Sequence, residues 1–186
     1  MDADARQLVV GIGGSTRATS LTDELLRTAL AEAEVRGART MAFGGAFLAQ
    51  LPIYVVDEDS AAAGELVTAV ASADGLIIAT PGYHGGMSGL VKNGVDHLES
   101  LRADGRPYLS GRAVGTIVTA AGWQACGTTL ASLRSTIHAL RGWPTPYGVT
   151  VNSADPVFAE GGVLLEHIAA ALRLVVDQVL DFALRA

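Results

Sequence analysis

The segment that decides the fold is residues 8–20, which read LVVGIGGSTRATS. An apolar run of strand length, residues 8–13, leads directly into a turn rich in glycine and hydroxyl groups. Residues 21–36 then carry an apolar stripe at helical spacing, and Gly37 ends this predicted helix. A buried strand joined by such a turn to an amphipathic helix indicates an α/β protein with a parallel sheet.

The alternation of strands and helices continues along the chain. Further strands are predicted at residues 39–43, 75–80, 113–119 and 147–151, and further helices at residues 61–71, 88–100, 127–140 and 162–184. Residues 44–60 are predicted to form a loop. Five strands alternating with five helices predict right-handed crossovers. We therefore expect a single domain over residues 1–186, built as a three-layer α/β/α sandwich.

The composition limits the class of protein. With 49% apolar and 17% charged residues, the 186-residue chain should fold as a globular protein. Its net charge is −6 and its 13 basic residues are scattered, so we expect no nucleic acid partner. A single cysteine excludes an intrachain disulfide framework, and we expect no metal site. No apolar run approaches the roughly 18 residues of a membrane span, so we expect a cytoplasmic protein.

Residues 14–20 have the chemistry of a phosphate-binding turn. Glycines allow the tight turn, and free N–H groups at the helix start favour an anion. Arg17 adds a forked, charged donor. Four hydroxyl groups complete the set, from Ser15, Thr16, Thr19 and Ser20. The plain alternative is a capped helix, because Ser20 and Asp23 have nearly the spacing of a capping box.

Two other phosphate-binding motifs do not fit. A Walker A loop requires a lysine, which this turn lacks. A dinucleotide fingerprint requires a third glycine where Thr16 stands. It also requires an acidic residue after the second strand, where residues 43–45 read FGG. A mononucleotide phosphate suits the turn better.

Two further turns could contact a flat ring system such as a flavin. Residues 81–89 read PGYHGGMSG, and their main chain could lie against the ring edge with Tyr83 beside it. Residues 120–124 read AAGWQ, where small residues permit close approach. Trp123 fits a pocket wall as well as a core or interface position. An ordinary glycine-rich turn is the alternative for residues 81–89.

Together these segments resemble the NAD(P)H-dependent FMN reductase family, a flavodoxin-like group that includes quinone, chromate and azo reductases. Residues 14–20 match its Gly-Ser-x-Arg-x-x-Ser motif. Residues 81–86, followed by GLVKN at 89–93 and Asp96, resemble Pro-Glu-Tyr-Asn-Gly-Ser with Gly-x-Leu-Lys-Asn-x-x-Asp. LPIY at residues 51–54 stands where members carry Leu-Pro-x-Tyr/Phe. The likeness extends from about Leu8 to Val151.

The resemblance implies a flavodoxin-like sandwich with five parallel strands in the order 2-1-3-4-5. It implies non-covalent FMN, ping-pong hydride transfer from NADPH or NADH, and a homodimer or homotetramer. The expected acceptor is free flavin, a quinone, an azo or nitro compound, or a pathway intermediate; a flavin-dependent monooxygenase could receive the reduced flavin. The expected FMN-binding residues are Ser15, Thr16, Arg17, Thr19, Ser20, Pro81, Gly82, Tyr83, His84, Gly85, Gly86, Ala121 and Gly122. Lys92, Asn93 and Asp96 are expected to be structural.

Three departures from the family pattern concern the acceptor. Gly82 stands where the motif has Glu, and His84 stands where it has Asn. Ala121-Gly122 replaces the Gly-Gly that follows the fourth strand in the family. Flavin binding through main-chain groups is compatible with all three. His84 is a candidate proton donor to the acceptor, although a hydrogen-bonding substitute for Asn is the simpler interpretation.

Two rival functions stay open. A flavodoxin-type electron carrier would bind FMN and protein partners, but such carriers usually lack an arginine in the phosphate loop and have a strongly acidic rim. Arg17 and the modest net charge favour the enzyme. A flavin-free structural or regulatory relative is the second rival. Cys126 is expected to be a small buried residue.

Overall fold

The computed structural model of the chain describes residues 6–17, 19–56, 58 and 60–183. Its centre is a sheet of seven strand segments, in which β2, β1, β3, β5 and β6 are neighbours in that order. β7 also pairs with β5, further along that strand than β6 does. β4 folds back on β3 and pairs with it in the antiparallel direction. The strands are β1 Leu8–Gly13, β2 Arg39–Phe43, β3 Gly75–Tyr83, β4 Gly86–Met87, β5 Ala113–Ala120, β6 Trp143–Pro144 and β7 Val149–Asn152.

The predicted strand order is confirmed, with β5 as the fourth strand and β6 and β7 together as the fifth. The expectation of five strands, all parallel, was wrong in two places. The fifth strand is broken between Pro144 and Val149, where Pro146 has no N–H to continue the ladder. The third strand runs on to Tyr83 and forms an antiparallel hairpin with β4.

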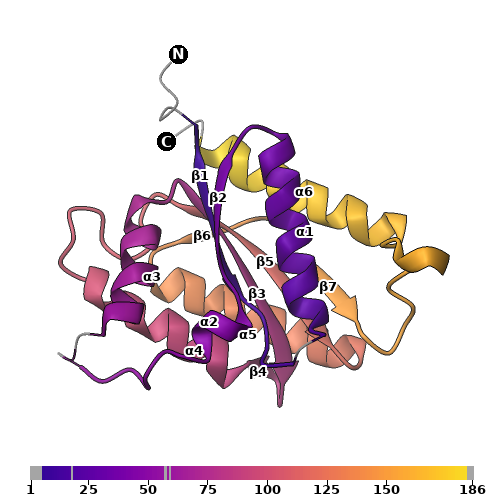
Figure 1. Cartoon of the computed structure of the whole chain (residues 1–186), viewed down its shortest axis with the longest axis horizontal. Helices are drawn as coiled ribbons and strands as arrows, with labels where there is room; N and C mark the ends of the chain where they lie inside the picture. Colours follow the sequence, from indigo (N-terminus) through magenta and orange to yellow (C-terminus); the bar gives the residue numbers. More distant parts are fainter. Residues whose placement is uncertain (1–5, 18, 57, 59, 184–186) are drawn as a thin grey trace.

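Helices cover both faces of the sheet, with α1 and α6 on one face and α3, α4 and α5 on the other (Figure 1). Their bounds are α1 Leu21–Val35, α2 Gly45–Leu48, α3 Ala61–Ser72, α4 Gly89–Asp96, α5 Trp123–Ala139 and α6 Glu166–Ala183, with short 3-10 turns η1 His97–Leu101 and η2 Glu160–Gly162. Among the described residues, none of these helices combines the length and the apolar character needed to cross a membrane.

One loop prediction and three helix predictions needed correction. The predicted loop 44–60 contains α2, which Gly44 precedes in extended conformation. The helix predicted at 88–100 tightens into η1 after Asp96, and the one predicted at 127–140 already begins at Trp123. The last helix begins at Glu166 rather than at residue 162. Gly161 has φ 82°, and a bridge pairs Phe158 with Leu164 before the helix.

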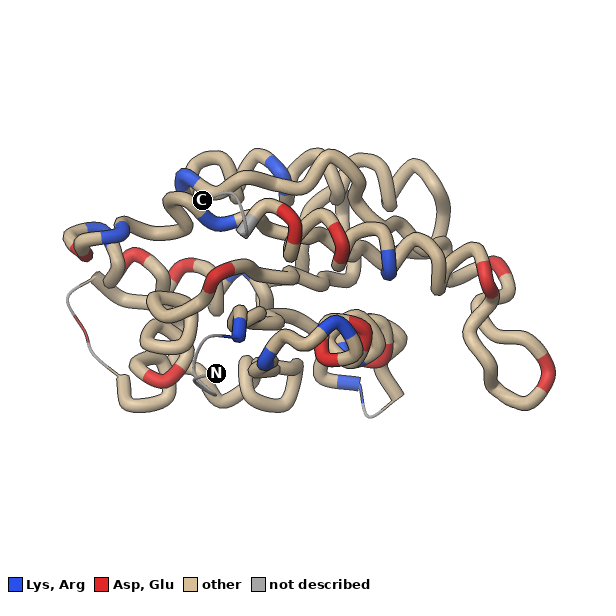
Figure 2. The backbone as a smooth tube through the Cα atoms, turned by 90° about the horizontal axis from the view of Figure 1, so that it is seen from above, with Lys and Arg blue, Asp and Glu red and all other residues tan. Residues whose placement is uncertain are grey.

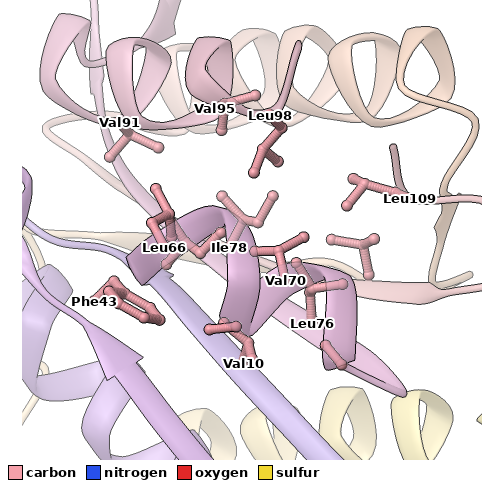
Figure 3. Packing of buried hydrophobic residues seen from close by; sticks show 14 of the residues in the cluster. Val10, Phe43, Leu66, Val70, Leu76, Ile78, Val91, Val95, Leu98 and Leu109 are labelled. Carbon is pink, nitrogen blue, oxygen red and sulfur yellow. The ribbon is translucent and has the colours of Figure 1, made fainter. Parts of the chain in front are cut away.

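Two apolar clusters hold the layers together. Strand residues alternate between them, so that Val10 faces one cluster and Val9 the other. The cluster under α3, α4 and α5 includes Leu66, Ile78 and Leu98, which meet in Figure 3. Fully burying one such side chain contributes roughly 1.5–3 kcal/mol. These contacts outweigh the surface ion pairs described next.

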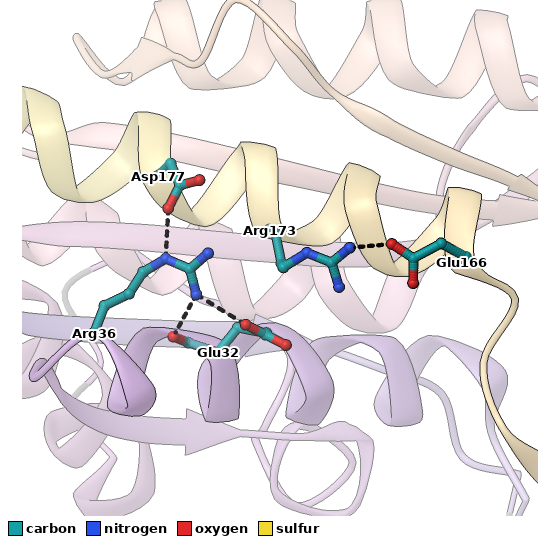
Figure 4. Close-up of polar contacts among 5 residues, drawn as sticks. All are labelled: Glu32, Arg36, Glu166, Arg173 and Asp177. Atoms are coloured by element: carbon teal, nitrogen blue, oxygen red, sulfur yellow. Dashed lines mark hydrogen bonds and ion pairs between the residues drawn. The ribbon is translucent and has the colours of Figure 1, made fainter.

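One ion pair, Arg36–Asp177, joins the end of α1 to α6 at the surface, and two others lie within these helices (Figure 4). Arg36 contacts Asp177 at 2.5 Å and Glu32 at 2.8 Å, while Arg173 pairs with Glu166 within α6. Hydrogen bonding to Asp177 is the main reason why the pKa of Arg36 is raised. Exposed pairs of this kind contribute about 0–1 kcal/mol each. Acidic and basic residues are interspersed along both helical layers (Figure 2).

Arg112 is a buried cation at the start of β5. Its guanidinium donates to the carbonyl oxygens of Ala73 at 3.0 Å, Tyr108 at 2.8 Å and Ala71 at 2.5 Å. The side chain is fully buried, and this burial lowers its pKa to about 10, with help from the charge of Arg106. The group therefore remains charged at neutral pH and ties the end of α3 to the segment before β5.

We expect Arg112→Met to lower the free energy of unfolding by about 3 kcal/mol, because three carbonyl groups lose a charged donor while the methionine fills most of the volume. Urea denaturation followed by circular dichroism measures the change. Arg106→Met is the matched control, since Arg106 also donates to Ala73 but is only half-buried. Equal losses for the two variants would show that burial of Arg112 does not matter.

Candidate functional site

The three segments singled out in the sequence meet at one edge of the sheet. β1, β3 and β5 are parallel neighbours, so their C-terminal ends lie side by side. Gly13 stands beside Ala79, and Pro81 beside Thr119. The N–H of Gly14 donates to the carbonyl of Ala79 at 3.2 Å, which fixes the start of the first turn against β3.

The turn after β1 is organised by one carboxylate. Asp23 accepts hydrogen bonds from the N–H groups of Ser15 and Gly45, both at 2.9 Å. Ser20 caps α1 by accepting from the N–H of Asp23 at 3.2 Å. The helix cap considered as an alternative is therefore present. The side chain of Asp23, however, holds the turn and α2 rather than returning to the cap.

Two glycines make this arrangement possible. Gly14 has φ 114°, and a Cβ there would lie 2.1 Å from the Asp23 carboxylate. A Cβ on Gly45 would lie 2.0 Å from the carbonyl oxygen of Ser15. The motif at residues 14–20 indicated the importance of Gly14. Gly45 was missed, because it follows β2 and is distant in sequence from this motif.

Arg17 is exposed and lines a cleft of about 280 Å³. Within the described part of the chain, neither Arg17 nor Arg27, a second guanidinium on the same cleft, forms an ion pair. Arg27 lies two turns along α1 and has no motif that could have identified it. The cleft is lined by Ser15, Thr16, Arg17, Ser20, Asp23, Arg27, Gly45, Ala46 and Ala49. Thr19 is exposed beside it, and Ala18 lies outside the described residues.

Residues 81–86 form the end of β3 and a hairpin, not the loop predicted. Gly82 pairs with Met87 and Tyr83 with Gly86, which leaves His84 and Gly85 as a two-residue turn. Their φ angles of 51° and 86° are those of a type I′ turn. His84 is a residue type that tolerates this left-handed region, as Asn does. The backbone thus explains why His replaces the Asn of the family motif.

The space beside Gly82 is filled by another side chain. A Cβ at this position would lie 2.6 Å from Oγ1 of Thr129 and 3.1 Å from Cβ of Ala120. Thr129 is buried on α5, and its hydroxyl donates to the carbonyl of Gly86 at 3.4 Å. The Glu of the family motif therefore has no room here, because α5 packs against the hairpin.

The turn after β5 is fixed from β7. The N–H of Gly122 donates to Oδ1 of Asn152 at 2.7 Å, so this donor is already in use within the chain. Asn152 is itself held by Asp155 at 2.9 Å. Gly122 has φ 109° with open space around it, so the backbone conformation alone requires glycine. Ala121 beside it is exposed.

Trp123 does not belong to the core. Its side chain is 61% exposed and borders a cleft of about 220 Å³ between β7 and α6. Tyr147 and His167 line the same cleft. Its exposure excludes the core position that the sequence left open for Trp123, and a pocket wall or an interface position fits.

Asn93 and its neighbours support a distant loop. The Asn93 side chain accepts from the N–H of Tyr54 at 2.8 Å and donates to the carbonyl of Pro52 at 2.9 Å. A ring nitrogen of His97 also lies 3.0 Å from the Pro52 carbonyl. Lys92 and Asp96 form an ion pair at 2.6 Å. These contacts give the residues the structural role expected for them.

Cys126 lies near this edge but is not a candidate nucleophile. It is 1% exposed, and its Sγ donates weakly to the carbonyl of Val151 at 3.5 Å. Burial is the main cause that raises the pKa of its thiol. A thiol held in its neutral form and out of solvent suits the packing role predicted from the sequence.

Comparisons with known proteins agree with this architecture. A sequence model described as NADPH-dependent FMN reductase matches residues 8–155. An FMN-dependent NADPH-azoreductase of Staphylococcus aureus is 30% identical over 130 residues, which are 68% of this chain and 65% of the relative. That of Staphylococcus haemolyticus is 29% identical over 116 residues, 61% of this chain and 58% of the relative. The matches thus span about three fifths of the curated relatives.

Solved structures extend the likeness to nearly the whole chain. The apo form of an NADH:FMN oxidoreductase, EMOB, superposes with a TM-score of 0.73 at 25% identity, covering 96% of this chain and 89% of that one. The flavoenzyme FerB of Paracoccus denitrificans gives 0.77 at 20% identity, with coverages of 96% and 98%. At 20% identity, the likeness to FerB shows a shared fold.

Proposed function

We propose a function on the premise that the chain belongs to the NADPH-dependent FMN reductase family, whose model covers residues 8–155. The protein is an NAD(P)H-dependent flavin oxidoreductase that binds FMN without a covalent bond and acts as one domain over residues 1–186. The observation that carries this function is the meeting of three turns, residues 14–20, 81–86 and 120–122, at one sheet edge.

The described residues at this edge fit FMN. Arg17 is exposed and forms no ion pair with any described residue. It lies beside the cap of α1, where a phosphate group would find a charged donor and a helix N-terminus. Tyr83, His84 and Gly85 of the hairpin are exposed, so a flat ring can approach them. We assign FMN binding to Ser15, Thr16, Arg17, Thr19, Ser20, Pro81, Gly82, Tyr83, His84, Gly85, Gly86, Ala121 and Gly122. Because the N–H of Gly122 is held by Asn152, this residue contributes shape rather than a donor.

Bound FMN supplies the redox chemistry by accepting a hydride from NADPH or NADH and passing it to an acceptor. The chain's part is to position the reacting atoms, which must approach to about 3–3.5 Å. The hairpin and the turn after β5 are held by Thr129 and Asn152, so the ring site is rigid before the cofactor arrives. No side-chain nucleophile is needed.

The acceptor is a small molecule, and an azo compound is the class that the names of the Staphylococcus relatives suggest. Free flavin, a quinone or a flavin-dependent monooxygenase that receives reduced flavin are further candidates. We also propose a cytoplasmic homodimer or homotetramer. An exposed apolar segment supports this assembly, since Ile53, Val55 and Val56 have 79%, 46% and 66% of their surface exposed.

The visible spectrum of the purified protein tests the function. After loading with FMN and removal of free flavin, we expect a yellow protein that bleaches on anaerobic addition of NADPH or NADH and recovers its colour with an azo dye or quinone. A protein that stays colourless with added FMN would refute the proposal. Accumulation of a stable semiquinone would instead indicate an electron carrier.

Arg17→Ala should weaken FMN binding by about 1.5–3 kcal/mol, the range for a hydrogen bond to a charged group. Quenching of flavin fluorescence measures the dissociation constant. Arg173→Ala, which removes a partly exposed arginine on α6, is the control and should leave the dissociation constant unchanged. Equal affinity for the Arg17 variant and the unmodified protein would mean that the phosphate lies elsewhere.

We further propose that His84, exposed at the tip of the hairpin, donates a proton to the reduced acceptor. His84→Asn keeps a residue that tolerates the left-handed turn, so FMN binding should stay within about twofold. The acceptor half-reaction should slow by about 100-fold, the lower end for a general acid, while the NADPH half-reaction is unchanged. Stopped-flow absorbance separates the two. Unchanged rates in both would make His84 a backbone substitute for Asn.

A further inference from the structure

A buried pair of hydroxyl groups lies beneath the three turns. Oγ1 of Thr22 and Oγ1 of Thr119 are 2.6 Å apart, although 97 residues separate them in the sequence. Thr22 is the second residue of α1, and Thr119 is the last but one of β5. Only 3% and 5% of their surfaces are exposed.

The pair joins the two ends of the proposed FMN site. Thr22 follows the turn 14–20, which we assign to the phosphate, and Thr119 precedes the turn 120–122, which we assign to the ring. Pro81 stands directly beside Thr119 in the sheet. In FMN the ribityl chain connects the phosphate to the ring, so under this assignment it runs between the two turns that Thr22 and Thr119 join.

One hydroxyl hydrogen of the pair has no acceptor among the residues that the structure describes. Two hydroxyl groups carry two hydrogens, and the bond between Thr22 and Thr119 uses one of them. Whichever oxygen donates, the second hydrogen remains, and no other hydrogen bond of either side chain is present in this part of the chain. Each hydroxyl already has one partner, and the remaining hydrogen is available to an acceptor outside the described residues.

We propose that the pair donates this hydrogen to a ribityl hydroxyl oxygen of FMN, which makes Thr22 and Thr119 additional binding residues of the site. The inference rests on the proposed function. The two threonines also tie the phosphate turn to the ring turn, and a purely structural tie is the alternative that an experiment must exclude. The bound ribityl oxygen gives this site a preference for flavins with a hydroxylated chain.

The test compares two ligands on two proteins. One ligand is FMN, and the other is an analogue whose five-carbon chain carries the phosphate but no hydroxyl groups. The variant is Thr22→Val together with Thr119→Val, which replaces both polar partners by groups of similar shape and should therefore fold normally. Flavin fluorescence gives the four dissociation constants.

The unmodified protein should bind FMN more tightly than the analogue. In the double variant the ratio of the two dissociation constants should be about threefold to tenfold smaller, which corresponds to one neutral hydrogen bond. A merely structural tie would weaken both ligands equally and leave the ratio unchanged, which would overturn the proposal. The two single variants then show which hydroxyl donates. Serine at that position should restore the preference.

Thr116→Val is the matched control on the same strand. Thr116 is also a buried threonine, and its hydroxyl has no hydrogen-bond partner among the described residues, but it lies three residues before Thr119, away from the edge. This variant should keep the full preference for FMN. Loss of the preference in Thr116→Val would contradict a local effect. Failure of the unmodified protein to bind either ligand would refute the proposed function instead.

Discussion

The sheet edge to which we assign FMN depends on the Asp23 carboxylate. Its two oxygens accept from Ser15 and Gly45, so one side chain ties the turn after β1 to the start of α2. Each such charged hydrogen bond contributes roughly 1.5–3 kcal/mol. The bonds also hold an anion where a phosphate is expected. Arg17 and Arg27, both on the neighbouring cleft, supply the opposite charge that makes this tolerable.

Similar contacts hold the other two turns. Asn152 fixes the turn after β5 through Gly122, and Thr129 on α5 supports the hairpin through Gly86. Thr22 and Thr119 then connect the first turn to the third. The edge is therefore ordered by the protein itself, and a ligand would lose little binding energy to ordering it.

The sequence allowed prediction of the strands in the interior but not of these contacts. β1 ends where its apolar run ends, because burial on both faces selects the same residue types along the whole strand. The hairpin at residues 82–87 was missed, since a pair of glycines indicates a turn but not which residues will pair across it. Asn152 and Gly45 could not be assigned from local patterns. Their partners, Gly122 and Asp23, are 30 and 22 residues away in the sequence.

The same edge combines side chains that order the turns with side chains that are exposed. The groups that order the turns, Asp23, Asn152 and Thr129, are wholly or partly buried and engaged within the chain. Tyr83 and Trp123, by contrast, have 50% and 61% of their surface exposed beside the same edge. A change in either exposed side chain would alter the surface of the edge without releasing a turn. Under the proposed function, selection for a new acceptor can therefore act on these positions, whereas substitution of Asp23 or Asn152 would disturb the edge itself.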